Sequence, residues 1–246
     1  MKVMDKDLFG LVLTSVSTLL MAFTFFMQMG QFRHTQKDSF RTRFEGTFFN
    51  MLSIFYNVRS ETNKSIQQSS LLNSESLKDF YDSFKDEYKH EVETNKSFKE
   101  AMALLHKSDI LPTQYETSLN DLGAFFDSYT KKQGCNAGFY FRYVHNLILF
   151  VIEHWKNSEK DIHTYLNFIQ AQISDEELAL LFYDSISKKG EDKSHRHTFK
   201  ENLDAYSFLE NITDNILLDR CHYKLFPHTV FRFLNEDERK EVRGKR

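Results

Sequence analysis

Residues 8–27 read LFGLVLTSVSTLLMAFTFFM and contain no Lys, Arg, Asp, Glu or His, whereas the rest of the chain is strongly polar. A helix of about 20 residues can cross roughly 30 Å of hydrocarbon, because it pairs its own backbone groups where no water can reach them. Hydroxyl side chains such as Thr14 can bond to the backbone within such a helix. We therefore predict a single transmembrane anchor in residues 1–30.

Two other interpretations of this segment are a signal peptide and a buried helix of a soluble protein. A cleaved signal peptide would use Lys2 and Lys6 as its basic region, but Asp5 and Asp7 offset them and no small-x-small cleavage pattern follows the apolar run. Five Ser and Thr residues dilute the hydrophobicity, as a buried soluble helix would allow. The spanning helix is favoured because the apolar residues leave no polar face wide enough for solvent.

Basic residues on the two sides of the run predict its orientation. Four of them follow it, at Arg33, Lys37, Arg41 and Arg43. Only two lysines precede it, beside two aspartates. The positive-inside rule then predicts a single-pass protein of the inner membrane with its N-terminus outside and its body in the cytoplasm. The same four residues form a basic collar suited to anionic lipid headgroups.

Small residues form a row along the predicted anchor. Gly10, Thr14 and Thr18 recur every four positions, which places them on one face of a helix. Such a row lets two helices approach closely in a bilayer. The expected partners are therefore the lipid bilayer and a second copy of the chain in a homo-oligomer.

The body of the chain, residues 31–235, has the composition and periodicity of a helical bundle. Only 8 Gly and 2 Pro occur in 246 residues, so the chain lacks the turn-forming residues that an all-β protein needs for its many tight turns. Apolar residues recur every three or four positions in successive segments, the first of which contains Phe40, Phe44, Phe48, Leu52 and Phe55. The fold class predicted is all-α, with a charged flexible tail at residues 236–246.

Several local features of this bundle follow from the sequence. The stretch 139–155 is apolar nearly all round, so we expect it at the centre. Thr113 with Glu116 and Ser174 with Glu177 fit capping boxes at helix N-termini. The last long helix is expected from residue 199 to residue 216, after a charged loop at 188–197.

The chain lacks the common signatures of enzymes and cofactor sites. It has no glycine-rich phosphate loop, no GxSxG, no HExxH and no CxxC pair. His195, His197, Cys221, His222 and His228 are candidate metal donors, but their spacing matches no zinc family, and the two cysteines are expected to be free thiols. We therefore predict no cofactor and no metal, and the net charge of −3 gives no sign of nucleic-acid binding.

We favour a non-enzymatic role over a catalytic one. An enzyme with a non-standard site would use the polar residues of the apolar helix, Arg142 and His145, together with Glu177. Arg142 and His145 lie on one helix face at i and i+3. The alternative is that both simply line one side of a core helix.

The chain resembles a family of bacterial proteins described as putative phage abortive infection proteins. The resemblance covers roughly residues 40–215 in blocks, and its most distinctive part is YLNFIQAQISDEELALLF at residues 165–182. Further blocks contain Phe44, Glu45, Thr47, Phe48, Phe49, Met51 and Leu52, then Tyr140, Phe141, Arg142, Leu147 and Phe150, then Phe199, Lys200 and Tyr206 before LENI.

This resemblance implies an antiviral role, in which an infected cell stops growing or dies before phage matures. It supplies no catalytic residues. Some members of the family have two N-terminal membrane segments, whereas this sequence contains one predicted segment. The resulting hypothesis is a membrane-anchored effector or sensor that acts by oligomerisation or membrane perturbation, with a phage or defence protein as a possible partner. The alternatives are a membrane-tethered nuclease-like or other enzyme and a scaffold that recruits another defence protein.

Overall fold

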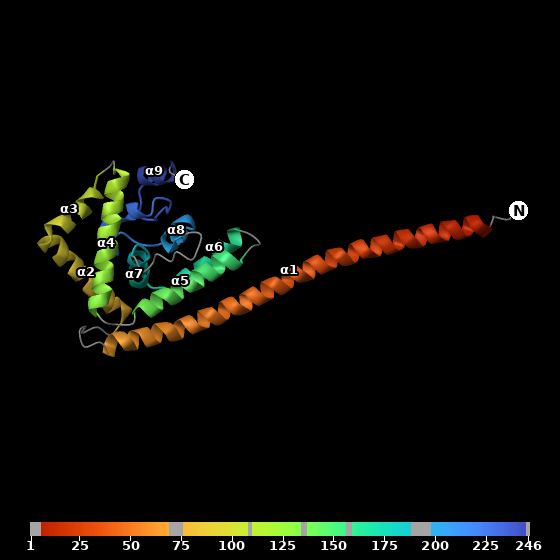
Figure 1. The fold of residues 1–246 in the computed structure, drawn as a ribbon, viewed down its shortest axis with the longest axis horizontal. Coiled ribbons are helices and arrows are strands. Elements are labelled where there is room, and N and C mark those ends of the chain that lie inside the picture. Colours follow the sequence, from red (N-terminus) through yellow and green to blue (C-terminus); the bar gives the residue numbers. More distant parts are fainter. Residues whose placement is uncertain are drawn as a thin grey trace. The chain divides into compact units, whose positions relative to one another are not determined.

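The computed structural model describes residues 6–68, 76–107, 110–133, 137–155, 159–187 and 198–244, without the side chains of residues 6–14, 159–160 and 244. These residues are helical or lie in turns and contain no strand, which confirms the prediction of an all-α protein (Figure 1). The chain divides into two compact units, Met1–Asn50 and Met51–Arg246. Each unit is considered by itself.

Helix α1 runs from Lys6 to Gln68 and joins the segment predicted as an anchor to the aromatic-striped segment after it. The prediction of a transmembrane anchor is wrong. Over the described part of the chain, no helix contains a stretch both long and apolar enough to cross a membrane. From Ser15 onward, Ser17, Thr18 and Thr24 alternate with the apolar residues, and Gln28 and Gln31 follow, which lowers the mean hydropathy.

The same finding overturns the predicted localisation as a single-pass inner-membrane protein with its N-terminus outside. The run is free of charged residues, but hydroxyl groups interrupt its described part. The side chains of Gly10 and Thr14 lie outside the described residues.

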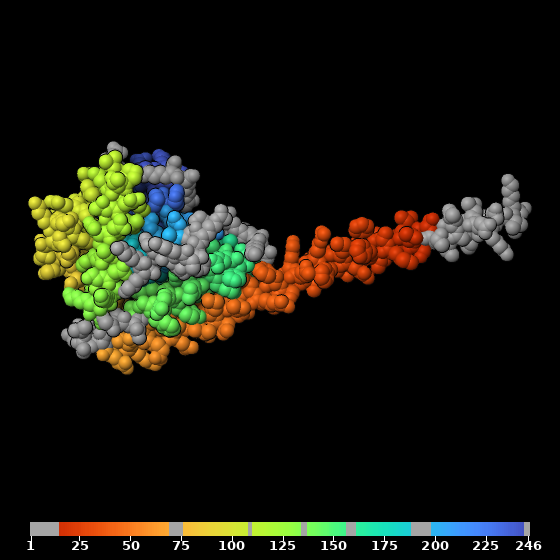
Figure 2. Space-filling model, viewed as in Figure 1, coloured from red at the N-terminus to blue at the C-terminus, as the bar shows by residue number. Residues whose placement is uncertain are grey.

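The unit Met51–Arg246 is built from the end of α1 and the elements that follow it. These elements are α2 (Leu77–Thr94), α3 (Lys96–Leu104), α4 (Pro112–Gln133), α5 (Ala137–His154), α6 (Glu159–Gln170), α7 (Asp175–Ser185), α8 (Phe199–Ala205), the 3-10 helix η2 (Arg220–Leu225) and α9 (Glu236–Gly244). Helices α2 and α3 pack together, and α3 packs on α4, beside which it is seen at the left of Figure 2.

Helix α7 forms the centre of this unit. It packs against both α2 and α4, and the six residues from Leu178 to Tyr183 are all buried. The prediction that residues 139–155 would be central is wrong, because α5 leaves Phe139 half-exposed and Arg142 exposed and buries one face only. An apolar run of six residues in a short helix is thus more deeply buried than the longer apolar helix.

Capping residues explain where two of the helices begin. Ser174 Oγ accepts the Glu177 N–H at 3.3 Å and the Glu177 carboxylate accepts the Ser174 N–H at 2.8 Å, which confirms the predicted capping box of α7. The capping box predicted at Thr113 is wrong, because α4 already begins at Pro112. Proline is favoured in the first turn of a helix, since it has no N–H to leave unpaired.

The chain after residue 198 differs from the sequence prediction. Helix α8 ends at Ala205 instead of continuing to residue 216, and Ser207 has a positive φ of 51° that a helix cannot accommodate. The segment predicted as a flexible tail contains α9, whose Glu238 carboxylate accepts two hydrogen bonds from Arg220 at 2.8 and 2.9 Å. The predicted loop at 188–197 lies outside the described residues.

Candidate functional site

The three residues predicted as catalytic candidates contact different neighbours. Arg142 is exposed, and its Nε donates to the Gly138 carbonyl at 3.2 Å within α5. The His145 ring lies 3.9 Å from the Phe199 ring, measured between centroids. Glu177 accepts a hydrogen bond from Arg59 Nη2 at 2.5 Å. The described contacts of Arg142 and Glu177 therefore serve local structure and not a shared reaction centre.

The Arg59–Glu177 ion pair connects α1 to the first turn of α7. Only 6 % of the Glu177 side chain is exposed, compared with 25 % for Arg59. Arg59 Nη2 also donates to the Gln172 carbonyl, and its guanidinium lies 4.8 Å from the centre of the Phe55 ring. Burial raises the pKa of Glu177, although the Ser174 N–H and the Arg59 guanidinium both oppose the rise. This arrangement is a buried structural connection.

The basic collar predicted to bind lipid headgroups lies on the exposed surface of α1. Arg33, Lys37, Arg41 and Arg43 are all exposed, and Arg41 Nε pairs with Glu45 at 2.8 Å. Thr18, the described member of the small-residue row, is also exposed. The collar thus includes one local ion pair of the kind that stabilises helices by a few tenths of a kcal/mol.

A cavity of about 440 Å³ lies between α6, the turn after α8, the segment 230–232 and α9. We call it the arginine pocket. Its walls contain three arginines and one carboxylate among other groups: His163, Leu166, Asn167, Gln170, Tyr206, Ser207, Phe208, Glu210, Val230, Arg232, Arg239 and Arg243. The excess of guanidinium groups over carboxylates indicates a preference for an anion.

The three arginines of the pocket differ in how they are held. Arg232 pairs with Glu210 at 3.1 Å, so its charge is offset within the pocket. Arg239 Nη2 donates to the Arg232 carbonyl, while its buried Nε has no hydrogen-bond partner among the described atoms. An unsatisfied buried donor is costly unless a ligand or water accepts from it. Arg239 and Arg243 therefore supply the positive charge available to a ligand.

The wall opposite α9 is conformationally constrained. Ser207 lines the pocket with its φ of 51°, a region that non-glycine residues seldom occupy and that is often associated with functional sites. Gln170 Nε2 donates to the Phe208 carbonyl at 2.7 Å, which fixes the turn on α6. The turn thus presents Tyr206 and Ser207 to the cavity in a defined conformation.

Sequence reasoning did not find this pocket. Its residues come from segments about 80 positions apart, and no spacing within one segment marks them. The only local signal was the pair Arg239 and Arg243, four residues apart and so on one face of a helix, inside the segment predicted to be a flexible tail.

Comparison with known proteins finds a match to a family model over about one third of the chain. Residues 136–216 match the family model described as "Putative phage abortive infection protein". No curated protein and no solved structure matches the chain. The match confirms the resemblance found in the sequence, and it suggests a role in phage abortive infection. It spans α5 to α8 and the Ser207 wall of the arginine pocket, but neither Arg239 nor Arg243.

Proposed function

We propose that this protein, in which residues 136–216 match the phage abortive infection family, is a non-enzymatic sensor or effector that acts through self-association and responds to an anionic ligand. The family match supports the antiviral role. Two observations support the proposed self-association and the proposed response to an anion. One is the exposed apolar surface of α1 in the unit Met1–Asn50, and the other is the arginine pocket in the unit Met51–Arg246.

The exposed surface of α1 favours self-association. Large apolar side chains are exposed at Val16, Leu19, Leu20, Met21, Phe23, Phe25, Phe26 and Met27. Exposure reaches 70 % for Leu19 and 71 % for Phe26. Soluble proteins seldom leave a continuous apolar patch of this kind in water.

The distribution of these residues indicates how many neighbours the helix needs. Consecutive residues of an α-helix point about 100° apart, so Leu19, Leu20 and Met21 face three different directions. A single neighbouring helix covers one stripe only. We propose that α1 helices from several copies of the chain surround one another, with the small side chain of Thr18 allowing close approach.

The first prediction concerns this assembly. Replacing Leu19, Phe23 and Phe26 together with Ser removes three buried side chains from the assembly, each worth about 1.5–3 kcal/mol. We expect the dissociation constant between copies to rise by at least about three orders of magnitude, and protection against phage to be lost. Analytical ultracentrifugation and plaque counts on cells with each variant measure the two effects.

The matched control for this prediction is Phe168→Ser. Phe168 is 47 % exposed but lies on α6, which belongs to the unit Met51–Arg246 and not to the unit that contains the exposed apolar stretch of α1. This variant should sediment and protect as the unchanged chain does. Loss of assembly with full protection would contradict the role of self-association, whereas a monomeric unchanged chain would contradict the assembly itself.

The second prediction concerns the arginine pocket. We expect pyrophosphate and ATP, as probes of phosphate-bearing ligands, to bind the full chain with one site measurable by calorimetry. Arg239→Gln and Arg243→Gln should each weaken binding at least about tenfold, since a hydrogen bond to a charged group contributes about 1.5–3 kcal/mol.

Lys132→Gln is the control for charge alone. Lys132 lies on α4, pairs with Glu87 at 2.7 Å and does not line the arginine pocket. The Lys132→Gln substitution removes one positive charge, as each of the two arginine substitutions does. Equal weakening by all three variants would show a nonspecific effect of net charge and would overturn the assignment of the pocket.

A further inference from the structure

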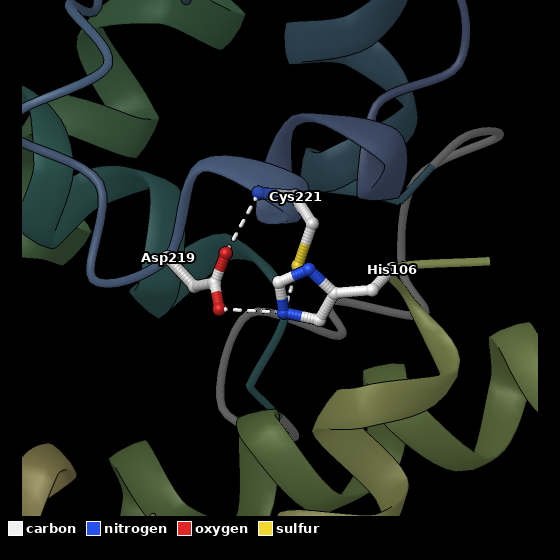
Figure 3. Close-up of side chains that lie close together, drawn as sticks. All are labelled: His106, Asp219 and Cys221. Carbon is white, nitrogen blue, oxygen red and sulfur yellow. Dashed lines mark hydrogen bonds and ion pairs between the residues drawn. The ribbon is translucent and has the colours of Figure 1, made fainter. Parts of the chain in front are cut away.

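The side chains of His106, Asp219 and Cys221 converge although His106 is more than 110 residues from the other two (Figure 3). His106 follows α3, Asp219 caps the N-terminus of η2, and Cys221 lies in the first turn of η2. His106 Nε2 is 2.9 Å from Asp219 Oδ2 and 3.6 Å from Cys221 Sγ. The three possible ligand atoms lie within 4.8 Å of one another.

This geometry does not fit a nucleophilic triad. In a triad the imidazole contacts the nucleophile with one ring nitrogen and the carboxylate with the other. Here the same nitrogen, His106 Nε2, faces both Asp219 and Cys221. If Nε2 carries a proton toward the carboxylate, it has no lone pair with which to accept the thiol proton. The cluster is therefore arranged around a common point.

We propose that His106 Nε2, Asp219 Oδ2 and Cys221 Sγ bind one Zn²⁺ ion, with a water or an added ligand in the fourth position. Nitrogen, carboxylate oxygen and thiolate are the donors that zinc takes, and three protein ligands with one open position are usual in sites that are not purely structural. A thiolate among the ligands disfavours Mg²⁺ and Ca²⁺, which take oxygen donors.

The two distances from His106 Nε2 require only a small adjustment, and Asp219 Oδ2 and Cys221 Sγ, which lie within 4.8 Å of each other, must close to the same tetrahedral separation. Zinc bonds of about 2.0–2.3 Å in a tetrahedral site separate neighbouring ligand atoms by roughly 3.3–3.8 Å. The separation of His106 Nε2 from Cys221 Sγ, 3.6 Å, already fits. The imidazole must move away from Asp219 by a few tenths of an ångström, and its side chain, 60 % exposed, is free to do so.

Surrounding contacts orient the proposed ligands. Asp219 Oδ1 accepts the Cys221 N–H at 2.9 Å, which holds the carboxylate beside the thiol and leaves Oδ2 for the ion. Such contacts to the outer oxygen are typical of metal sites. Lys224 Nζ donates to the Lys107 carbonyl at 2.7 Å and brings the same two segments together. A bound ion would thus connect the turn after α3 to η2.

Binding has a defined proton balance. Formation of the Zn–S bond requires the thiolate, so the Cys221 S–H bond breaks and its proton is released to solvent. The imidazole must bind in its neutral form, with Nε2 free to donate its lone pair. No oxidation or reduction is involved, because Zn²⁺ keeps its charge.

Cobalt titration of the purified, metal-free full chain tests the site. Co²⁺ in a tetrahedral site with a thiolate ligand gives intense visible d–d bands and a near-ultraviolet sulfur-to-cobalt charge-transfer band. We expect both bands to saturate at one ion per chain and to disappear when Zn²⁺ is added. Zn²⁺ alone should also raise the thermal unfolding midpoint.

Variants assign the ligands. Cys221→Ser should abolish the charge-transfer band, and His106→Ala should weaken Zn²⁺ binding by at least about 100-fold. Cys135→Ser is the matched control, since it removes the only other cysteine, and should retain the bands. Absence of the bands from the unchanged chain, or their loss in Cys135→Ser but not in Cys221→Ser, would overturn the proposal.

Discussion

Replacing Gly123 with Ala is expected to lower the free energy of unfolding by about 3 kcal/mol, although Ala is the better helix former by about 1 kcal/mol. Gly123 lies in α4 where this helix meets the C-terminal end of α7. An added Cβ would lie 3.1 Å from the Ile186 carbonyl carbon and 3.3 Å from Ser187 Cα, and it would overlap the Ile186 carbonyl oxygen. All three atoms belong to the backbone, so no side chain can move aside.

Urea denaturation followed by circular dichroism measures this loss. Gly138→Ala is the matched control, because Gly138 also lies in a helix and an added Cβ there meets nothing within 4 Å. That variant should be as stable as the unchanged chain or more stable by up to about 1 kcal/mol. Equal stabilities of the two variants would mean that α4 and α7 do not approach closely at Gly123.

The sequence predicted features that depend on neighbouring residues. The apolar stripe of Leu77, Phe80, Tyr81, Phe84 and Tyr88 is buried in α2, as its spacing indicates. The capping box at Ser174 forms for the same reason, since both of its hydrogen bonds join residues three apart. Periodicity and capping are local properties, so they can be read without the fold.

Features that depend on distant residues could not be predicted. From the sequence, Gly123 is only a residue of low helix propensity. Its close approach to the backbone of Ile186 and Ser187 depends on how α7 packs against α4. The central position of α7 has the same origin, because its six consecutive buried residues show no periodicity. They are covered by α2 and α4, and by ring contacts with Phe226 and His222 from a distant segment. The arginine pocket and the His106 cluster likewise combine residues from separate segments.

The error at the end of the last predicted helix has a more local cause. Apolar residues continue at helical spacing past α8, at Leu209, Ile212 and Ile216. The backbone nevertheless turns at Ser207, whose N–H donates to the Asp204 carbonyl at 3.1 Å and whose φ is positive. A serine does not predict a positive φ, whereas a glycine or an asparagine at this position would have indicated a left-handed conformation.

Replacing Arg59 with Met is expected to cost about 3 kcal/mol of stability, because it leaves the Glu177 carboxylate buried without its cation. Burial already raises the pKa of Glu177, and removal of the guanidinium should raise it further. A carboxyl group whose pKa is higher in the folded state penalises folding when it is ionised. The loss should therefore be large at about pH 7 and shrink as the pH falls through the folded-state pKa of Glu177.

The double variant Arg59→Met with Glu177→Gln separates the charge effect from lost packing. Gln cannot ionise but can still complete the capping box with Ser174, so most of the stability should return. Glu87→Gln provides the exposed comparison, because its partner Lys132 is 64 % exposed and the pair should contribute less than about 1 kcal/mol. A pH-independent loss in Arg59→Met that the second substitution does not restore would locate the effect in packing over Phe55 and not in the buried charge.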